Sequence, residues 1–485
     1  MTHQLYPLRR LPGLSRWEAW MDRVANVLLV VGLGVLLGVQ YVAPDKRVLS
    51  VSAAAVVVGV AWRLDMISGL CVAILAMPFP RGTTFGSTNL ALILLLLVIY
   101  LLRIAQRQVA PPQSSPTDVP IVAFFLAYIV SFYNIENAHD FGFAFLNFVL
   151  LTGTFLFFFL ISNTVDNEKA LERLHTFCVI SLLAVCLVGV YELGHPGGTL
   201  IPEWIEFHAT QGREFNRHDI RIGSIFYDYE LLADYCGLNL LLCTFLFLRA
   251  RSLYRRLFMG GMLLLTMAIM FSTVTRGPLV SLSVALLFLV WRIRRHVRVV
   301  PATVIGSIVA ALFIGMNFFV ANFSRSGDLF GRVAKTQFIG LVPDSRVATW
   351  QPAFERMLKH PLLGWGPYYP TEHGIESVFW PHCLYLYVGN LTGFIGLGFF
   401  LWILWTFWKI TTPRTDSLTS PSYTESYLLI AQVQLVFFIV DQVKIEYLRN
   451  TVYPYQVWLM FALWVAAYKL ARKSRAAAVA AAAPA

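Results

Sequence analysis

Long apolar runs recur along the whole chain and constrain its fold more than any other feature. Each run has about 15 to 25 residues, and short polar segments separate them. A helix of about 20 apolar residues crosses the hydrocarbon core of a bilayer and satisfies its backbone hydrogen bonds internally. Because 57% of the residues are hydrophobic and only 13% are charged, few runs are interrupted. The sequence therefore predicts an all-α polytopic integral membrane protein.

We expect one membrane domain over residues 1–485, with a disordered Ala-rich tail at 476–485. Two of the apolar runs, 48–62 and 66–80, are short enough to form a hairpin that does not fully span, so the predicted count is 12 to 14 transmembrane helices. The predicted spans are 24–41, 48–62, 66–80, 87–102, 119–133, 141–163, 174–193, 226–248, 257–274, 278–293, 300–322, 383–408, 427–443 and 452–470.

Lys and Arg gather in alternate loops, and this asymmetry predicts the orientation in the membrane. Clusters of them lie at 249–256 and 292–298 and in the C-terminal tail. Such loops stay on the cytoplasmic side of a membrane, so both termini are predicted to be cytoplasmic. The extracytoplasmic loops are then 194–225, 274–278, 323–382 and 444–451. This topology also accounts for the net charge of +11, so we expect no nucleic-acid partner.

The polar interval from Ser324 to His382 is the longest loop of the chain. A transport pore has little use for so many polar residues at one membrane face. An enzyme acting on a lipid-linked substrate needs them, because its cavity must be open to water above and to lipid below. Arg346, Trp350 and Phe354 recur at helical spacing, which predicts a short amphipathic helix over 345–359 on the membrane surface. We interpret Trp350 as packing of that helix.

The tripeptide Thr275-Arg276-Gly277 lies between two apolar runs with almost no loop. Pro278 is suited to the first turn of the next helix, and Gly277 permits a tight backbone. An arginine at a helix N-terminus opposes the helix dipole, so helix stability does not explain Arg276. It suits a bound anion, since amide groups and the guanidinium would both face phosphate oxygens.

Arg221 and a group of acidic residues stand at the entrance of the next predicted span. Asp228, Glu230 and Asp234 would cost several kcal/mol if they faced lipid, so we expect them to face a cavity in the protein. Arg221 is either a site arginine or an interfacial arginine of an aromatic belt. The sequence has no CxxC motif and no zinc spacing, so we predict neither metal nor cofactor, although these three carboxylates leave a metal site open.

His382 stands on the first turn of a span, after Pro381 and beside the long polar loop. A histidine in that position is an available proton acceptor near neutral pH. From residue type alone, a lone histidine is more often a structural hydrogen-bonding residue than a catalytic one.

Three motifs in the same order resemble the O-antigen ligase and polymerase superfamily of bacterial glycan enzymes. They are TRG at 275–277, the R-x3-W and HPLLGWG elements between 346 and 366, and HCLYLYVGNLTGFIGL at 382–397. The resemblance covers roughly residues 200–460. In that family an Asn usually follows the His, whereas this chain has Cys383, so no role carries over to that side chain.

The resemblance implies a GT-C-like fold whose large extracytoplasmic loop carries short helices. It implies an inverting, metal-independent glycosyltransferase that moves a glycan from undecaprenyl diphosphate to a sugar hydroxyl of an acceptor glycan or glycolipid. Arg221 and Arg276 would bind the diphosphate with help from Arg346, and His382 would be the general base. A chain-length regulator protein would be a further partner.

The two activities of the family, polymerase and ligase, differ in their acceptor. A third interpretation, a transporter, belongs to another class of protein. We favour a polymerase of lipid-linked O-antigen or exopolysaccharide repeat units. The first alternative is an O-antigen ligase that joins the glycan to lipid A core. The second alternative is a transporter of lipid-linked glycans, which would place charged residues through the middle of many spans.

The predicted topology is testable by labelling. A cysteine introduced at Asp344 should react with a membrane-impermeant thiol reagent in intact spheroplasts, because the loop at 323–382 is predicted to be extracytoplasmic. Reaction only after lysis would reverse the orientation.

Overall fold

The structure is a computed structural model of the 485-residue chain. It describes residues 20–21, 23–28, 30–32, 35, 46–78, 87–136, 138–195, 222–226, 228–294, 314–315, 317–318, 338–339, 342–368, 380–413, 422–449 and 452–482. Parts of the predicted span at 24–41, most of the predicted span at 300–322, most of the loop at 194–225 and parts of the loop at 323–382 lie outside these residues.

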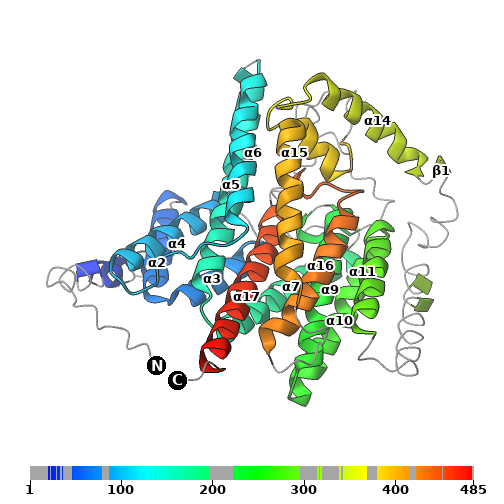
Figure 1. Cartoon of the computed structure of the whole chain (residues 1–485). Helices are drawn as coiled ribbons and strands as arrows, with labels where there is room; N and C mark the ends of the chain where they lie inside the picture. Colours follow the sequence, from blue (N-terminus) through cyan, green and yellow to red (C-terminus); the bar gives the residue numbers. More distant parts are fainter. Residues whose placement is uncertain are drawn as a thin grey trace. The chain divides into compact units, whose positions relative to one another are not determined.

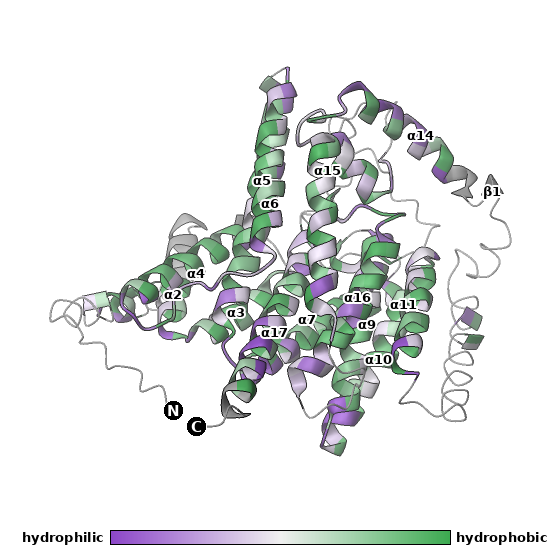
Figure 2. Ribbon diagram, viewed as in Figure 1, coloured by the Kyte–Doolittle hydropathy of each residue, from purple (hydrophilic) through white to green (hydrophobic). Residues whose placement is uncertain are grey.

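Six described helices are long and apolar enough to cross a membrane, and they confirm the all-α polytopic class. Hydrophobic residues make up most of the helical ribbon (Figure 2). The six are α6 (Ala138–Thr164), α7 (Glu168–Gly194), α9 (Tyr229–Arg249), α10 (Leu253–Ser272), α15 (Leu384–Thr411) and α16 (Tyr423–Asp441). Several other predicted spans are shorter helices, so the count of 12 to 14 stays a prediction.

The chain forms two compact units, and the single membrane domain stays a prediction. The smaller unit comprises residues up to 73 together with 91–112. It contains α2 (Lys46–Arg63), the first residues of α3 (Met66–Ala76) and most of α4 (Ser87–Ala105). Arg103 on α4 donates to the carbonyl oxygens of Trp62 and Leu64 at 2.9 and 2.7 Å, which closes the exposed end of α2.

The larger unit is a helical bundle built from residues 74–90 and from 113 onward. In Figure 1 its helices run alongside one another, and α9 packs on α10, while α11 (Gly277–Ile293) packs on α16. Similarly, α17 (Tyr453–Ala482) packs on α6, and α15 packs on α5 (Asp118–Val130). The beginnings of α9 and α11 meet where Thr275 contacts Tyr229, and Tyr453 at the start of α17 bonds Asp234 of α9. Gln442 bonds both Asp234 and Leu384 at the start of α15, so α9, α11, α15 and α17 all begin at one end of this bundle. We call it the site end.

Side-chain caps set where several of these helices begin. Asp228 accepts hydrogen bonds from the Glu230 and Leu231 amides at 2.8 and 3.2 Å, which starts α9. The Ser422 hydroxyl accepts a hydrogen bond from the Glu425 amide at 3.3 Å, which starts α16. Pro278 lies in the first turn of α11, as the sequence predicted. The caps satisfy amide groups that a helix leaves unpaired at its N-terminus.

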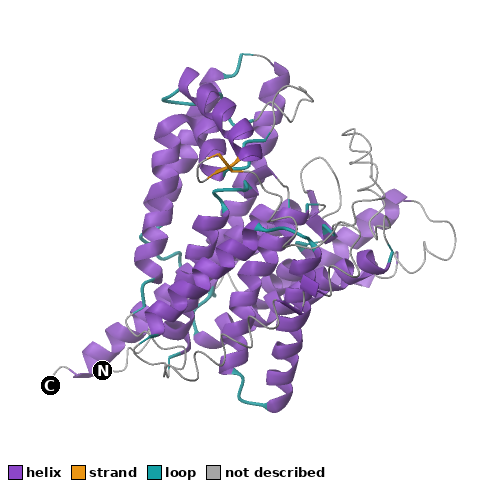
Figure 3. Ribbon diagram, turned by 90° about the vertical axis from the view of Figure 1, so that its right-hand side faces the viewer, coloured by secondary structure: helices purple, strands orange, loops and turns teal. Residues whose placement is uncertain are grey.

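The predicted amphipathic helix is present as α14 (Asp344–Lys359). Its residues Ala353 and Met357 are buried, and Phe354 and Leu358 are exposed. A short antiparallel pair, β1 (Phe338–Ile339) and β2 (Val342–Pro343), precedes it, with Ile339 opposite Val342. Figure 3 shows this pair as the small strand element in an otherwise helical fold.

A break inside α15 receives the backbone of the loop that follows α14. Gly393 has φ 66° and ψ −170°, a conformation that is essentially restricted to glycine. The loop at 360–366 pairs with both sides of the break. Trp365 N donates to Asn390 O at 2.8 Å, and Phe394 N donates to Pro361 O at 2.7 Å. Non-helical backbone at membrane depth is tolerated where protein satisfies it, and this loop supplies the partners.

The same loop is held from the other side by α6 and the turn before it. Asn134 donates to Gly364 O at 2.6 Å, and Asn147 donates to Pro367 O at 3.1 Å. The Tyr368 hydroxyl donates to Asp140 Oδ2 at 2.9 Å. Burial, reinforced by that carboxylate, raises the pKa of Tyr368 to about 12, so the hydroxyl keeps its proton and the link persists at neutral pH. The loop therefore joins α6 to α15.

The C-terminal tail differs from the expectation of disorder. Helix α17 continues to Ala482, so residues 476–482 are helical. Alanine has the highest helix propensity, which explains why an Ala-rich segment extends the helix before it.

Gly393→Ala should destabilise the protein by about 2 kcal/mol or more, because a Cβ there would lie 2.2 Å from Leu362 O in a conformation that costs other residues strain. Gly398→Ala is the matched control in the same helix, since a Cβ there meets nothing within 4 Å. Thermal unfolding in detergent measures both. Equal midpoints for the two variants would contradict the close contact between Gly393 and the loop at 360–366.

Candidate active site

The predicted site residues within the described chain come together at the site end of the larger unit. Arg276 precedes α11, Arg346 lies on the first turns of α14, and His382 precedes α15. Arg221, the fourth predicted residue, lies outside the described residues. The described parts of the four loops predicted to share a face are therefore at one end of the bundle.

The turn that carries Arg276 has a strained backbone. Val274 has φ 51°, which is an outlier for a β-branched residue. The Thr273 hydroxyl accepts from the Thr275 amide at 3.3 Å, and the Thr275 hydroxyl lies 3.4 Å from Tyr229 O at the start of α9. These contacts place Arg276 at the N-cap of α11 beside the first turn of α9. Strained turns of this kind cluster at functional sites.

Glu230 joins the two remaining predicted residues. Its Oε1 lies 3.4 Å from Arg346 Nη2, and its Oε2 lies 3.8 Å from His382 Nδ1. All three side chains are largely buried, with 17% of Glu230, 20% of Arg346 and 28% of His382 exposed. Partial burial strengthens these charge interactions relative to those of exposed pairs.

His382 is held in a second strained conformation, with φ 48°. The first residue of α15 is fixed by two hydrogen bonds, because Leu384 N donates to Gln442 O and Ile445 O at 2.9 and 3.1 Å. On the other side, the Thr349 hydroxyl of α14 lies 3.4 Å from Pro381 O. The surrounding contacts therefore determine the position of the imidazole.

Cys383 stands where the related family usually has Asn. Its side chain is buried, and the side chain that faces Glu230 is His382.

A buried polar cluster lies beneath the site. Asp234 Oδ2 accepts from Tyr453 OH at 2.6 Å and from Gln442 Nε2 at 3.0 Å. Asp441 Oδ1 contacts Lys444 Nζ at 2.6 Å and accepts from Ser281 Oγ at 2.9 Å. The two carboxyl groups lie close enough to each other to interact electrostatically. Asp234 was expected to face a cavity; it is instead fully buried and serves this cluster.

Lys444 connects the cluster to the arginine turn. A Cβ added at Gly277 would lie 1.9 Å from Lys444 Cε, so the lysine stem covers the glycine that follows Arg276. Residues 441–445 thereby contact the beginnings of α9, α11 and α15. Sequence reasoning missed Asp441 and Lys444, although an acidic residue at the end of an apolar run was a visible signal.

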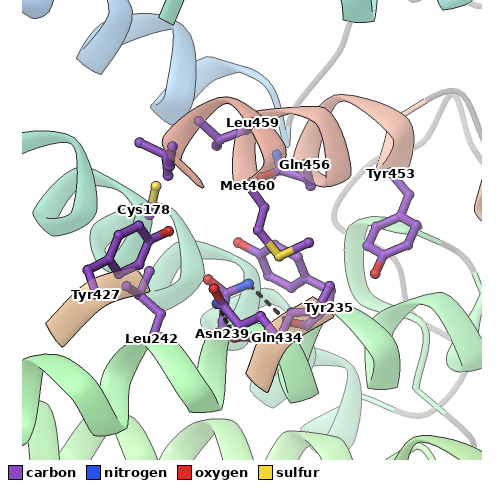
Figure 4. A pocket seen from close by; sticks show the side chains of 12 residues that line it. Cys178, Tyr235, Asn239, Leu242, Tyr427, Gln434, Tyr453, Gln456, Leu459 and Met460 are labelled. Carbon is purple, nitrogen blue, oxygen red and sulfur yellow. Dashed lines mark hydrogen bonds between the residues drawn. The ribbon is translucent and has the colours of Figure 1, made fainter. Parts of the chain in front are cut away.

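A small cavity lies deeper in the bundle, between α7, α9, α16 and α17 (Figure 4). Its volume of about 30 Å³ has room for roughly two water molecules and is too small for a glycan. Asn239, Gln434 and Gln456 line it with several tyrosines. Gln456 Nε2 is buried without a hydrogen-bond partner in the described chain, so an ordered water suits this cavity.

Lys444→Met should destabilise the protein by about 2 kcal/mol, because it leaves the buried Asp441 carboxylate without its ammonium partner. The figure is below that for a fully buried pair, since 23% of Lys444 is exposed. Adding Asp441→Asn should restore much of the loss, because the amide still accepts from Ser281. Denaturation in detergent measures both variants; a single variant as stable as the parent would show that the pair contributes nothing.

Comparison with known proteins agrees with the geometry. Residues 260–401 match the family model described as O-antigen ligase, a range that includes Arg276, Arg346 and His382. No curated protein sequence gives a significant match to the chain. This match over residues 260–401 supports the resemblance to the O-antigen ligase and polymerase superfamily.

Proposed function

We propose that the protein is a glycosyltransferase that moves a glycan from undecaprenyl diphosphate to a sugar hydroxyl at the outer face of the inner membrane. The observation that carries this proposal is that Arg346 and His382 both face Glu230, whose neighbour Tyr229 contacts the turn that carries Arg276. The family match supports a glycan enzyme of this kind. Its donor, acceptor and orientation are part of the proposal.

The proposed reaction is a single displacement at the anomeric carbon. The acceptor oxygen forms a bond to that carbon while the bond to the diphosphate oxygen breaks, and the electron pair leaves with the diphosphate. The acceptor hydroxyl proton passes to His382 Nε2, because Nδ1 faces Glu230. Attack from the opposite side inverts the anomeric configuration.

The proposed role of the arginines is to stabilise the negative charge that develops on the leaving diphosphate. Expelling a diphosphate concentrates negative charge on its oxygens, and fixed guanidinium groups in a partly dry site stabilise it. Arg276 also stands where amide groups at the start of α11 can face the same oxygens. Arg346 and, from outside the described residues, Arg221 are proposed to contribute further charge.

We favour a polymerase that extends lipid-linked repeat units over a ligase that acts on lipid A core. The matching family description names a ligase, which keeps that alternative. Deleting the gene separates the two: loss of a polymerase leaves single lipid-linked repeats, and loss of a ligase leaves long lipid-linked chains. Gel analysis of undecaprenyl-linked glycans distinguishes these products, and an unchanged profile would contradict both activities.

The transporter reading receives less support. It requires charged side chains along the middle of many spans. The buried acidic pair of the described bundle, Asp234 and Asp441, instead lies at the site end, at the start of α9 and the end of α16.

His382→Ala should lower transfer about 10²–10⁴-fold, because general-base catalysis contributes that much. The variant should still insert and bind lipid diphosphate, since the arginines remain. Turnover of the parent should also fall with pH as imidazole becomes protonated and can no longer accept a proton. Transfer by purified protein in lipid vesicles measures both. A rate within a few-fold of the parent would remove His382 from the mechanism.

A further inference from the structure

Glu230 is shared between an arginine proposed to bind the donor and a histidine proposed to activate the acceptor. Each of its carboxylate oxygens faces a different partner, Oε1 toward Arg346 at 3.4 Å and Oε2 toward His382 at 3.8 Å. A helix-dipole interaction in the first turn of α9 accounts for an acidic residue there, but not for these two contacts.

The backbone at Glu230 is positioned for this role. Asp228 accepts from its amide at 2.8 Å, and Tyr229 O receives the Thr275 hydroxyl at 3.4 Å. Glu230 is thus fixed beside the Arg276 turn, while Arg346 arrives on a different helix. A diphosphate that engages Arg346 competes directly with Glu230 for the guanidinium.

We propose that Glu230 is a positioning residue that couples donor binding to activation of His382. While the diphosphate is absent, Arg346 neutralises much of the carboxylate charge. Once the diphosphate draws Arg346 away, the full charge of Glu230 acts on the imidazole and stabilises its protonated form, which makes Nε2 a stronger base. This inference rests on the proposed function, and it predicts that the base is strongest when the donor is in place.

The other charged groups at the site end set the background for this effect. Arg276 stands at the start of α11, and Lys444 and Glu446 lie in the turn after α16. These charges are unchanged when Glu230 is replaced, so a Glu230 variant isolates its own contribution.

The test is a pH titration of ¹³C-labelled histidines by NMR, on purified full-length protein with and without undecaprenyl diphosphate as the probe. His382→Gln assigns the His382 signal, and buried His175, bonded to Tyr423 OH at 2.7 Å, reports an intact fold. In the parent, the probe should move the His382 midpoint to higher pH. Glu230→Gln should lower the midpoint of the free protein by about 1 pH unit and reduce the effect of the probe.

Two further variants sharpen the result. Arg346→Gln should raise the midpoint of the free protein, and the probe should then change it little. Asp228→Asn is the matched control, because it removes one negative charge from the same helix start while its amide oxygen still caps α9; its titration should stay close to that of the parent. Superimposable titrations of Glu230→Gln and the parent would overturn the coupling.

The transfer assay keeps this outcome separate from the proposed function. If His382→Ala is inactive while His382 in Glu230→Gln titrates as in the parent, the coupling is wrong and the proposed function is retained. If His382→Ala is active, the histidine is not the base and the proposed function falls in that part.

Discussion

The break in α15 at Gly393 is the constraint on which the site depends. A helix interrupted at membrane depth must find partners for its free backbone groups, and the loop at 360–366 provides them. Asn390 also donates to Ala353 O at 2.9 Å, so the same region of α15 grips α14 directly. Because α14 is held in this way, Arg346 reaches Glu230, and Thr349 reaches the residue before His382. The positions of Arg346 and His382 therefore depend on the backbone hydrogen bonds between the loop at 360–366 and α15, which lie away from both side chains.

The second support is electrostatic and lies below the site. Asp234, Asp441 and Lys444 are held by polar side chains from α9, α11, α16 and α17. A charged group at a buried position is costly unless it is paired, so this cluster ties those helix ends to one another. The turn that contains Lys444 also accepts the amide of Leu384 and covers Gly277. Residues 441–445 thus support both the Arg276 turn and the start of α15. The two residues with strained backbone, Val274 and His382, lie in the segments that this support holds in place.

Much of this architecture could be predicted from the sequence, and the limits have physical causes. Apolar run length predicted the spanning helices, Pro278 predicted the start of α11, and the spacing of Arg346, Trp350 and Phe354 predicted α14. The gathering of loop residues at one end followed from alternation of the spans. The pairing of the loop at 360–366 with α15 around Gly393 was not predictable. It consists of backbone hydrogen bonds between two motifs that the sequence showed separately. The pairing of Asp234 with Asp441 joins residues far apart in the chain, and no local pattern reports such a contact.

The central claim is that Arg276, Arg346 and His382 form one diphosphate-dependent site arranged around Glu230. The most direct measurement is an experimental structure of the full-length protein in lipid nanodiscs with undecaprenyl diphosphate bound. The diphosphate should lie within hydrogen-bonding distance of Arg276 and Arg346, with Glu230 turned from Arg346 toward His382. A diphosphate bound away from both arginines, with Glu230 still paired to Arg346, would contradict the account.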